Sequence, residues 1–149
     1  MVNCGLYAEP KEVPDIRACL FYHTMDVPGH ARVDGDWDLR RGIDRYLGRT
    51  PFQGKRVLDV GSASGFLSFH MERQGAEVVS YDLSDEYLWD FVPFAGVDFT
   101  KEVAGYRDRI RRLDNGYWFG HHAYRSRARK VYGTVYRSEE RRVGKECRL

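Results

Sequence analysis

The sequence has no long hydrophobic run, no cysteine framework and no secretory leader pattern. A membrane-spanning helix needs about 18 consecutive apolar residues, and no such stretch occurs. Charged residues are spread over residues 1–20, where a signal peptide would carry an apolar centre. Cys4, Cys19 and Cys147 show no CxxC or CxxxH spacing, so neither a zinc site nor a disulfide scaffold is indicated. We therefore expect a cytoplasmic protein with no membrane contact and no bound metal.

Without the C-terminal tail, the positively and negatively charged residues are equal in number. Residues 137–149 show no apolar periodicity, and residues 137–148 resemble the translation of a sequencing-library adapter. The tail carries the whole net charge of +2, so the global charge indicates no class of partner. We expect the natural sequence to end near Tyr136 and treat residues 137–149 as a non-native tail. The composition, 42% hydrophobic and 14% aromatic, is typical of a globular domain with a core.

An apolar run that ends in two closely spaced glycines lies near the middle of the chain. Val57, Leu58 and Val60 are enough for one buried strand and too few for a helix. Gly61 and Gly65 enclose small residues, which predicts a tight turn where the backbone approaches a ligand closely. The first free amides of a helix that follows such a turn point into the space above the strand. A polar ligand is therefore expected at this turn.

A helix and a second strand follow the turn. Apolar side chains from Phe66 to Met71 form one side of a helix, and Gly75 is a suitable residue to end it. Residues 77–82 are typical of a strand. A strand, a helix and a strand joined by short loops form a right-handed βαβ unit with a parallel sheet. The sequence therefore predicts an α/β fold.

Asp82, at the end of this second strand, indicates the kind of ligand. It follows Gly61 by about twenty residues, a spacing at which an acidic side chain reaches the two hydroxyls of a ribose. A dinucleotide fingerprint would need glycine in place of Ala63 and Phe66, and a Walker loop would need Gly-Lys-Ser/Thr, which is absent. A nucleoside without a pyrophosphate is favoured, and a NAD-dependent oxidoreductase is the alternative.

Residues 59–65, Asp-Val-Gly-Ser-Ala-Ser-Gly, resemble the first motif of class I S-adenosylmethionine-dependent methyltransferases. The resemblance implies a Rossmann-like parallel sheet and S-adenosylmethionine as cofactor. It also implies that Asp59 helps to hold the cofactor's amino group, that Asp82 binds the ribose and that Leu83 flanks the adenine. Ala63 departs from the glycine common at its position, and its methyl group narrows the loop slightly. The loop would lie against the methionine part of the cofactor, and its residues are Gly61, Ser62, Ala63, Ser64 and Gly65.

The same resemblance implies a larger sheet than this chain encodes. Residues 130–136 are β-branched and aromatic and predict a third strand. Family members carry the residues that face the transferred methyl group on later strands, so no catalytic residue is assigned. We assign residues 1–35 to an N-terminal arm and lead-in segment and residues 36–136 to a partial binding domain. A fold truncated after about three strands is expected to expose one sheet face and to be inactive and unstable alone.

A second resemblance concerns the lead-in segment. Residues 21–26 and 35–40, followed by the first motif, are similar to a segment of methyltransferase-like proteins related to those that modify the wobble uridine of transfer RNA. In such proteins the segment packs over the cofactor, which makes Tyr22, His23 and Arg40 candidates for lining the site. This resemblance does not carry the substrate over, and the expected methyl acceptor is a small molecule or RNA.

A basic stretch interleaved with aromatic residues extends from Arg107 to Lys130. Such a mixture suits a phosphate-bearing, stackable partner, so a non-catalytic nucleic-acid-binding module is a further alternative. The simpler interpretation is a solvated helix face combined with core aromatics.

Four further helices complete the expected elements. Two of them, over residues 99–113 and 117–129, are separated by a predicted turn at Asn115-Gly116. A third is expected over residues 39–47, capped by Asp36 or Asp38. The fourth begins at Ser84 and runs toward Phe91.

Overall fold

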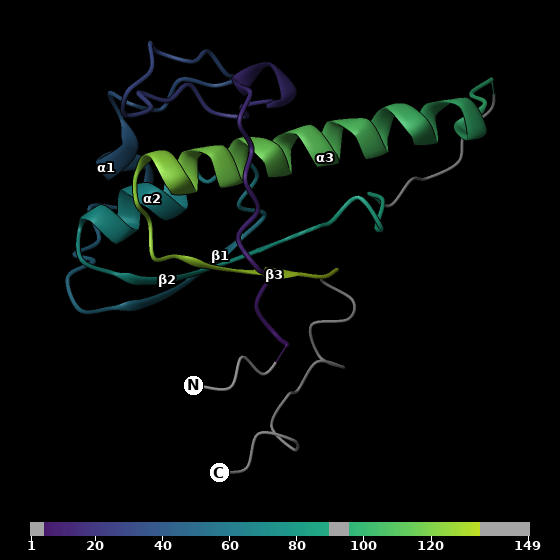
Figure 1. Ribbon diagram of the computed structural model, residues 1–149. Helices are drawn as coiled ribbons and strands as arrows, with labels where there is room; N and C mark the ends of the chain where they lie inside the picture. The colour runs from purple at the N-terminus through teal and green to yellow at the C-terminus, as the bar shows by residue number, and fades with distance from the viewer. Residues whose placement is uncertain (1–4, 90–95, 135–149) are drawn as a thin grey trace.

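Three adjacent strands form one parallel sheet in the computed structural model, which describes residues 5–89 and 96–134. Their order is β1 (Arg56–Val60), β2 (Glu77–Asp82) and β3 (Arg129–Tyr132). Figure 1 shows helices α2 (Phe66–Arg73) and α3 (Phe99–Ala123) on the same side of this sheet. The predicted α/β, Rossmann-like arrangement is therefore confirmed.

The βαβ unit agrees closely with the prediction. Gly65 adopts a φ of 84° directly before α2, and Gly75 adopts a φ of 92° directly after it, as only glycine does readily. α2 turns Phe66, Phe69 and Met71 into the core. Glycines at both ends of the helix thus fix its length, which brings β2 back parallel to β1.

Of the two predicted short helices, the one over residues 39–47 is mostly absent and the one after Ser84 is wrong. Only α1 (Ile43–Tyr46) forms in the first region, and its N-cap is Gly42, which offers no side-chain cap. Asp38 caps only a turn: its carboxylate accepts from the Arg40 amide at 3.1 Å and from the Arg40 guanidinium. After Ser84 the chain makes a turn up to residue 89, and Phe91 lies outside the described residues.

α3 is one continuous helix where a turn at Asn115-Gly116 was predicted. The covering segment, residues 18–42, packs along this helix. Asn115 Nδ2 donates to Ala18 O at 2.9 Å, and the Leu20 amide donates to Arg112 O at 2.8 Å. A Cβ on Gly116 would lie 2.4 Å from Leu20 O. Close approach of the covering segment therefore requires the glycine, and the helix continues through it.

Gly116→Ala is expected to lower the free energy of unfolding by about 1–3 kcal/mol, because the methyl group pushes the covering segment away from α3. Gly105 lies in the same helix, and a methyl group added there would meet nothing within 4 Å. Gly105→Ala is therefore expected to raise that free energy by about 0.5–1 kcal/mol through helix propensity. Urea unfolding of both variants checks the pair. If both substitutions changed the free energy of unfolding equally, the contact between α3 and Leu20 would not require Gly116.

The hydrophobic core lies between the covering segment and the two helices. It joins Phe21 and Met25 of the covering segment to Phe69 of α2 and to Tyr117 and Trp118 of α3. A short 3-10 helix, η1 (Ile16–Ala18), leads into the covering segment, and its partial cap is the Asp15 side chain, which accepts from the Arg17 amide. The residues 18–42 are thus an integral part of the core.

The opposite face of the sheet is open at β1 among the described residues, whereas Val131 of β3, which shares that face, is 6% exposed. Leu58 and Val60 on β1 are 62% and 56% exposed. Along a strand, side chains alternate between faces, and Val57 and Asp59 accordingly point toward the helices. In the described part of the chain no helix is long and apolar enough to cross a membrane.

Candidate functional site

A cavity of about 270 Å³ opens at the carboxyl ends of the strands. In parallel α/β sheets this edge is where ligands bind. Gly61 and Ala63 form its wall at the turn after β1, and Asp82 and Leu83 form its wall at the end of β2. The structure thus brings four of the predicted binding residues together. The remaining lining comes from the covering segment, the 84–89 turn, α3 and β3: Tyr22, Trp89, Arg109, Ile110, Leu113, Asp114 and Lys130.

Asp82 holds the turn after β1 in place. Its Oδ2 accepts a hydrogen bond from the Ala63 amide and one from Ser62 Oγ at 3.3 Å. Its Oδ1 accepts from the Leu83 amide at 2.7 Å. A carboxylate offers about four lone-pair sites, and these three bonds leave about one for the cavity. The side chain therefore both orders the turn and faces the cavity.

The amides of the turn are largely used within the protein. The Gly61 amide donates to Tyr81 O at 2.8 Å, and the Gly65 amide donates to Ser62 O at 2.8 Å. The Ala63 amide is taken by Asp82. A pyrophosphate site depends on such amides and on the absence of nearby negative charge. This turn consequently suits a ligand without phosphate groups.

Gly61 leaves room for a ligand. It adopts a φ of 78°, and a Cβ built on it would meet nothing within 4 Å. Ala63 also has a positive φ, 47°, which is uncommon for a residue with a side chain and stores strain in the turn. The open space beside Gly61 and the strained Ala63 mark the turn as a binding feature.

Asp59 does not line the cavity. It is 9% exposed, and Ser68 Oγ donates to its Oδ2 at 2.6 Å. Burial raises the pKa of the Asp59 carboxyl, although the hydrogen bonds from Ser68 oppose this effect. Since Gly65 provides no side-chain cap for α2, Asp59 supplies an acceptor at the first turn of that helix. The structure therefore places Asp59 behind the turn, where it supports α2.

A polar row crosses the sheet beneath the cavity. Asp59, Ser80 and Lys130 are neighbours in register on β1, β2 and β3. Ser68 Oγ lies 2.8 Å from Ser80 Oγ, and the Tyr117 hydroxyl donates to Ser80 Oγ at 2.9 Å. Hydrogen bonding of this kind satisfies buried polar groups that would otherwise destabilise the core.

Lys130 and Asp114 form a buried ion pair at the cavity wall. Lys130 is only 1% exposed, and its Nζ lies 2.9 Å from Asp114 Oδ1 and 3.9 Å from the centre of the Tyr117 ring. The same carboxylate accepts from the Tyr132 hydroxyl at 2.7 Å and pairs with Lys11 at 2.7 Å. Burial alone would raise the pKa of Asp114, but the two lysines outweigh it and hold that pKa below its usual value.

Of the three candidates from the covering segment, only Tyr22 lines the cavity. Its amide donates to Ser64 Oγ at 3.1 Å, which fastens the covering segment to the turn after β1. The His23 ring instead stacks on Phe66 at 5.2 Å, and burial lowers its pKa. Tyr22 thus contacts the turn through its backbone, and His23 lies beside it, outside the cavity lining.

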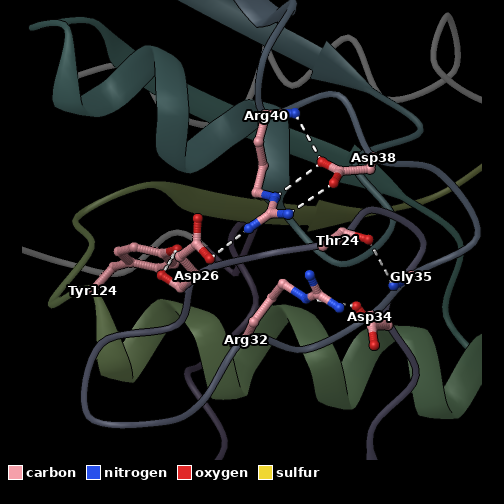
Figure 2. A network of polar contacts seen from close by, with 8 residues as sticks. All are labelled: Thr24, Asp26, Arg32, Asp34, Gly35, Asp38, Arg40 and Tyr124. Atoms are coloured by element: carbon pink, nitrogen blue, oxygen red, sulfur yellow. Dashed lines mark hydrogen bonds and ion pairs between the residues drawn. The ribbon is translucent and has the colours of Figure 1, made fainter.

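Arg40 belongs to a separate network of polar contacts, drawn in Figure 2. Its guanidinium donates to both carboxylate oxygens of Asp38 and, at 2.7 Å, to Asp26 Oδ1. The Tyr124 hydroxyl donates to Asp26 O at 2.7 Å, and this bond ties the network to the end of α3. Arg40 therefore braces the covering segment and is not a lining residue.

Three of the four aromatic residues of the basic stretch are core residues, and the fourth, Tyr124, is half-buried and packs against the core. Tyr117, Trp118 and Phe119 are 0%, 1% and 8% exposed. They are therefore not available to stack on nucleic-acid bases, and the simpler interpretation of this stretch as core aromatics agrees with the structure. Arg109, at the cavity mouth, pairs with Asp36 at 2.7 Å.

Comparisons with known proteins give short matches to one kind of enzyme. The chain is 46% identical over 46 residues to a ubiquinone biosynthesis O-methyltransferase of Xylella fastidiosa, which covers 31% of this chain and 19% of that protein. It is 40% identical over 57 residues to a ubiquinone biosynthesis O-methyltransferase of Ruegeria pomeroyi, which covers 38% of this chain and 21% of that protein. The likeness is to O-methyltransferases. No family model matches the chain, and no solved structure matches it significantly.

The similarity to methyltransferases supports only the general class of enzyme. The chain spans about a fifth of the length of these relatives. Their similarity, together with the parallel sheet, supports a class I methyltransferase in general terms. It leaves the acceptor open.

Sequence reasoning missed the part of the site that α3 contributes. Ile110, Leu113 and Asp114 line the cavity, but their helical spacing only indicated a covering element. Lys130 was grouped with the arginines of the basic stretch. Its place in a short strand, between an exposed and a buried neighbour, is the one local signal that its side chain faces the helices.

Proposed function

We propose that this chain carries the S-adenosylmethionine-binding half of a methyltransferase. The observation that carries the proposal is the position of Asp82, which faces the cavity while holding the turn at Ala63. An acid at the end of the second strand is suited to accept a hydrogen bond from a ribose hydroxyl. The similarity to O-methyltransferases supports the same conclusion.

The residues present fit this cofactor. The turn from Gly61 to Gly65, with Ser62, Ala63 and Ser64, would lie against the methionine part, with Tyr22 above it. Leu83, Ile110 and Leu113 give an apolar wall for the nucleobase, and Trp89 adds an aromatic face. The bound cofactor would supply a methyl group on a positively charged sulfur. The chain's own residues would bind, orient and shield it from water.

The role of Asp59 follows from its place behind the turn. Its carboxylate would act on the cofactor through α2 and the turn, since Ser68 separates it from the cavity. The amino group of the cofactor would then be held mainly by backbone carbonyls of the turn. His23 and Arg40 would shape the covering segment around Tyr22.

A NAD-dependent oxidoreductase is less well supported. The amides of Gly61, Ala63 and Gly65 are already engaged within the protein, so the turn offers few donors to a pyrophosphate. The volume of about 270 Å³ is also at the lower end for ligand pockets. Both features favour a single nucleoside.

For the acceptor, we propose the hydroxyl group of a small molecule. The matched relatives are named O-methyltransferases of ubiquinone biosynthesis. An RNA acceptor was supported by the basic stretch, and it loses that support because three of the four aromatic residues there are buried. No residue of the described ranges is assigned to the transfer step.

Isothermal titration calorimetry with S-adenosylhomocysteine and with NAD tests the cofactor assignment. We expect S-adenosylhomocysteine to bind and NAD to bind at least about tenfold more weakly, because the turn offers few free amides to a pyrophosphate. Equal or tighter binding of NAD would favour the oxidoreductase. Binding of neither ligand would contradict the assignment of this cavity.

A further inference from the structure

The N-terminal arm, residues 5–15, is held on the far side of the same cavity wall. Figure 1 shows it as the purple trace that crosses β3 and α3. The Ala8 amide donates to Lys130 O at 2.8 Å, and Lys11 Nζ lies 2.7 Å from Asp114 Oδ2. Both receiving residues, Lys130 and Asp114, line the cofactor cavity. The N-terminal arm and a ligand in the cavity would thus contact the same two residues.

Asp114 stands between two cavities. One is the cofactor cavity, and the other, of about 410 Å³, is lined by Asp114 together with residues of the arm, among them Tyr7 and Lys11. The two lysines that neutralise its carboxylate differ in exposure, because the Lys130 side chain is 1% exposed and the Lys11 side chain is 41% exposed. Lys11 is therefore the partner that can leave while the core stays folded.

Water in the cofactor cavity weakens the Lys11–Asp114 attraction, since the attraction between charges falls as the surroundings become more polar. A ligand that fills the cavity removes water from the inner side of Asp114. The ion pair then becomes stronger, and the arm is held more firmly. By thermodynamic linkage, a docked arm strengthens ligand binding by the same factor.

We propose that Lys11 is a positioning residue for the cofactor: its ion pair with Asp114 couples docking of the N-terminal arm to occupancy of the cavity. This inference rests on the proposed function, because it takes the ligand to be the nucleoside cofactor. Lys11 acts through Asp114 and does not itself line the cofactor cavity.

The arm has other attachments that do not depend on the charge of Lys11. The Arg129 guanidinium lies 4.5 Å from the centre of the Tyr7 ring, and His122 Nε2 donates to Lys11 O at 3.1 Å. Ala8 and Val13 pack against the hydrophobic core. A Lys11→Met variant is therefore expected to keep the fold and to lose only the coupling.

The test follows the Ala8 amide by hydrogen exchange in NMR, with and without S-adenosylhomocysteine, and measures affinity by calorimetry. In the unmutated chain we expect the ligand to slow Ala8 exchange by about fivefold or more, within the usual range of coupling. Lys11→Met should remove this slowing and weaken binding by the same factor. Lys11→Arg, which keeps the charge, should restore both. Lys55→Met removes a lysine at the opposite edge of the sheet, before β1, and should change neither.

Each outcome decides between the two proposals. If S-adenosylhomocysteine binds all variants equally and Ala8 exchange does not change, the coupling is wrong and the proposed function stands. If Lys11→Arg behaves as Lys11→Met does, the charge is not the coupling element, which also overturns the inference. If the unmutated chain does not bind S-adenosylhomocysteine, the proposed function fails and the inference fails with it.

Discussion

Asp114→Asn is expected to lower the free energy of unfolding at neutral pH by about 3–5 kcal/mol, the usual effect of breaking a buried ion pair. The Lys130 ammonium is almost fully buried and lies 2.9 Å from the Asp114 carboxylate. The substitution keeps the size of the side chain but leaves that ammonium without a counter-charge. Urea unfolding measures the loss.

The pH dependence of this loss has a defined sign. The pKa of Asp114 in the folded chain lies below its ordinary value of 3.8, because Lys130 and Lys11 outweigh the opposite effect of burial. The carboxylate therefore contributes its full stability above the unfolded pKa and loses it as pH falls through the lowered folded pKa. The difference between the unmutated chain and Asp114→Asn should be largest above about pH 5 and should shrink at lower pH.

Asp108→Asn is the matched control on the same helix. Asp108 is half exposed and pairs with Arg111 one turn away, so its loss should change the free energy of unfolding by less than about 1 kcal/mol. Combining Asp114→Asn with Lys130→Met removes the buried charge altogether and should recover part of the loss. If Asp114→Asn lowers the free energy of unfolding no more than Asp108→Asn does, the buried ion pair between Asp114 and Lys130 does not stabilise the cavity wall.

The βαβ unit could be predicted because its signals are local. Gly65 and Gly75 bound α2, and the apolar residues of β1 and β2 are contiguous in the sequence. Each element is thus specified by residues within it or next to it. The parallel pairing then follows from the short connections.

The error at Asn115-Gly116 shows where local signals fail. Both residue types favour turns in isolation. In the structure, their small size and amide group serve contacts with Ala18 and Leu20, almost a hundred residues earlier in the chain. Tertiary packing decides the conformation here, and the sequence carries no local sign of it.

The candidate site, like the fold, could be predicted only where its residues belong to a local motif. Gly61, Ala63, Asp82 and Leu83 follow from the motif and meet at the cavity. The wall formed by Asp114 and Lys130 depends on how β3 packs under α3, which the order of residues does not reveal. Asp59 belongs to the motif, but its side chain is turned toward Ser68 by the alternation along β1.

Asp82→Asn is expected to weaken binding of S-adenosylhomocysteine by about tenfold or more. A hydrogen bond from a ribose hydroxyl to a charged acceptor contributes about 1.5–3 kcal/mol, and the amide removes the charge. The remaining oxygen can still accept from the Ala63 amide, so the turn should stay closed, although the Leu83 amide loses its acceptor. The free energy of unfolding should then change by no more than about 1–2 kcal/mol.

Whether Asp82 binds the cofactor in this cavity is tested by calorimetric titration of S-adenosylhomocysteine into the unmutated chain, Asp82→Asn and Asp85→Asn. Asp85 is an exposed acid just beyond β2 that does not line the cofactor cavity, so its variant controls for the loss of one negative charge. We expect the unmutated chain and Asp85→Asn to bind with similar affinity, and Asp82→Asn to bind about tenfold or more weakly. Equal affinity of all three chains, or no binding to any of them, would contradict this role of Asp82.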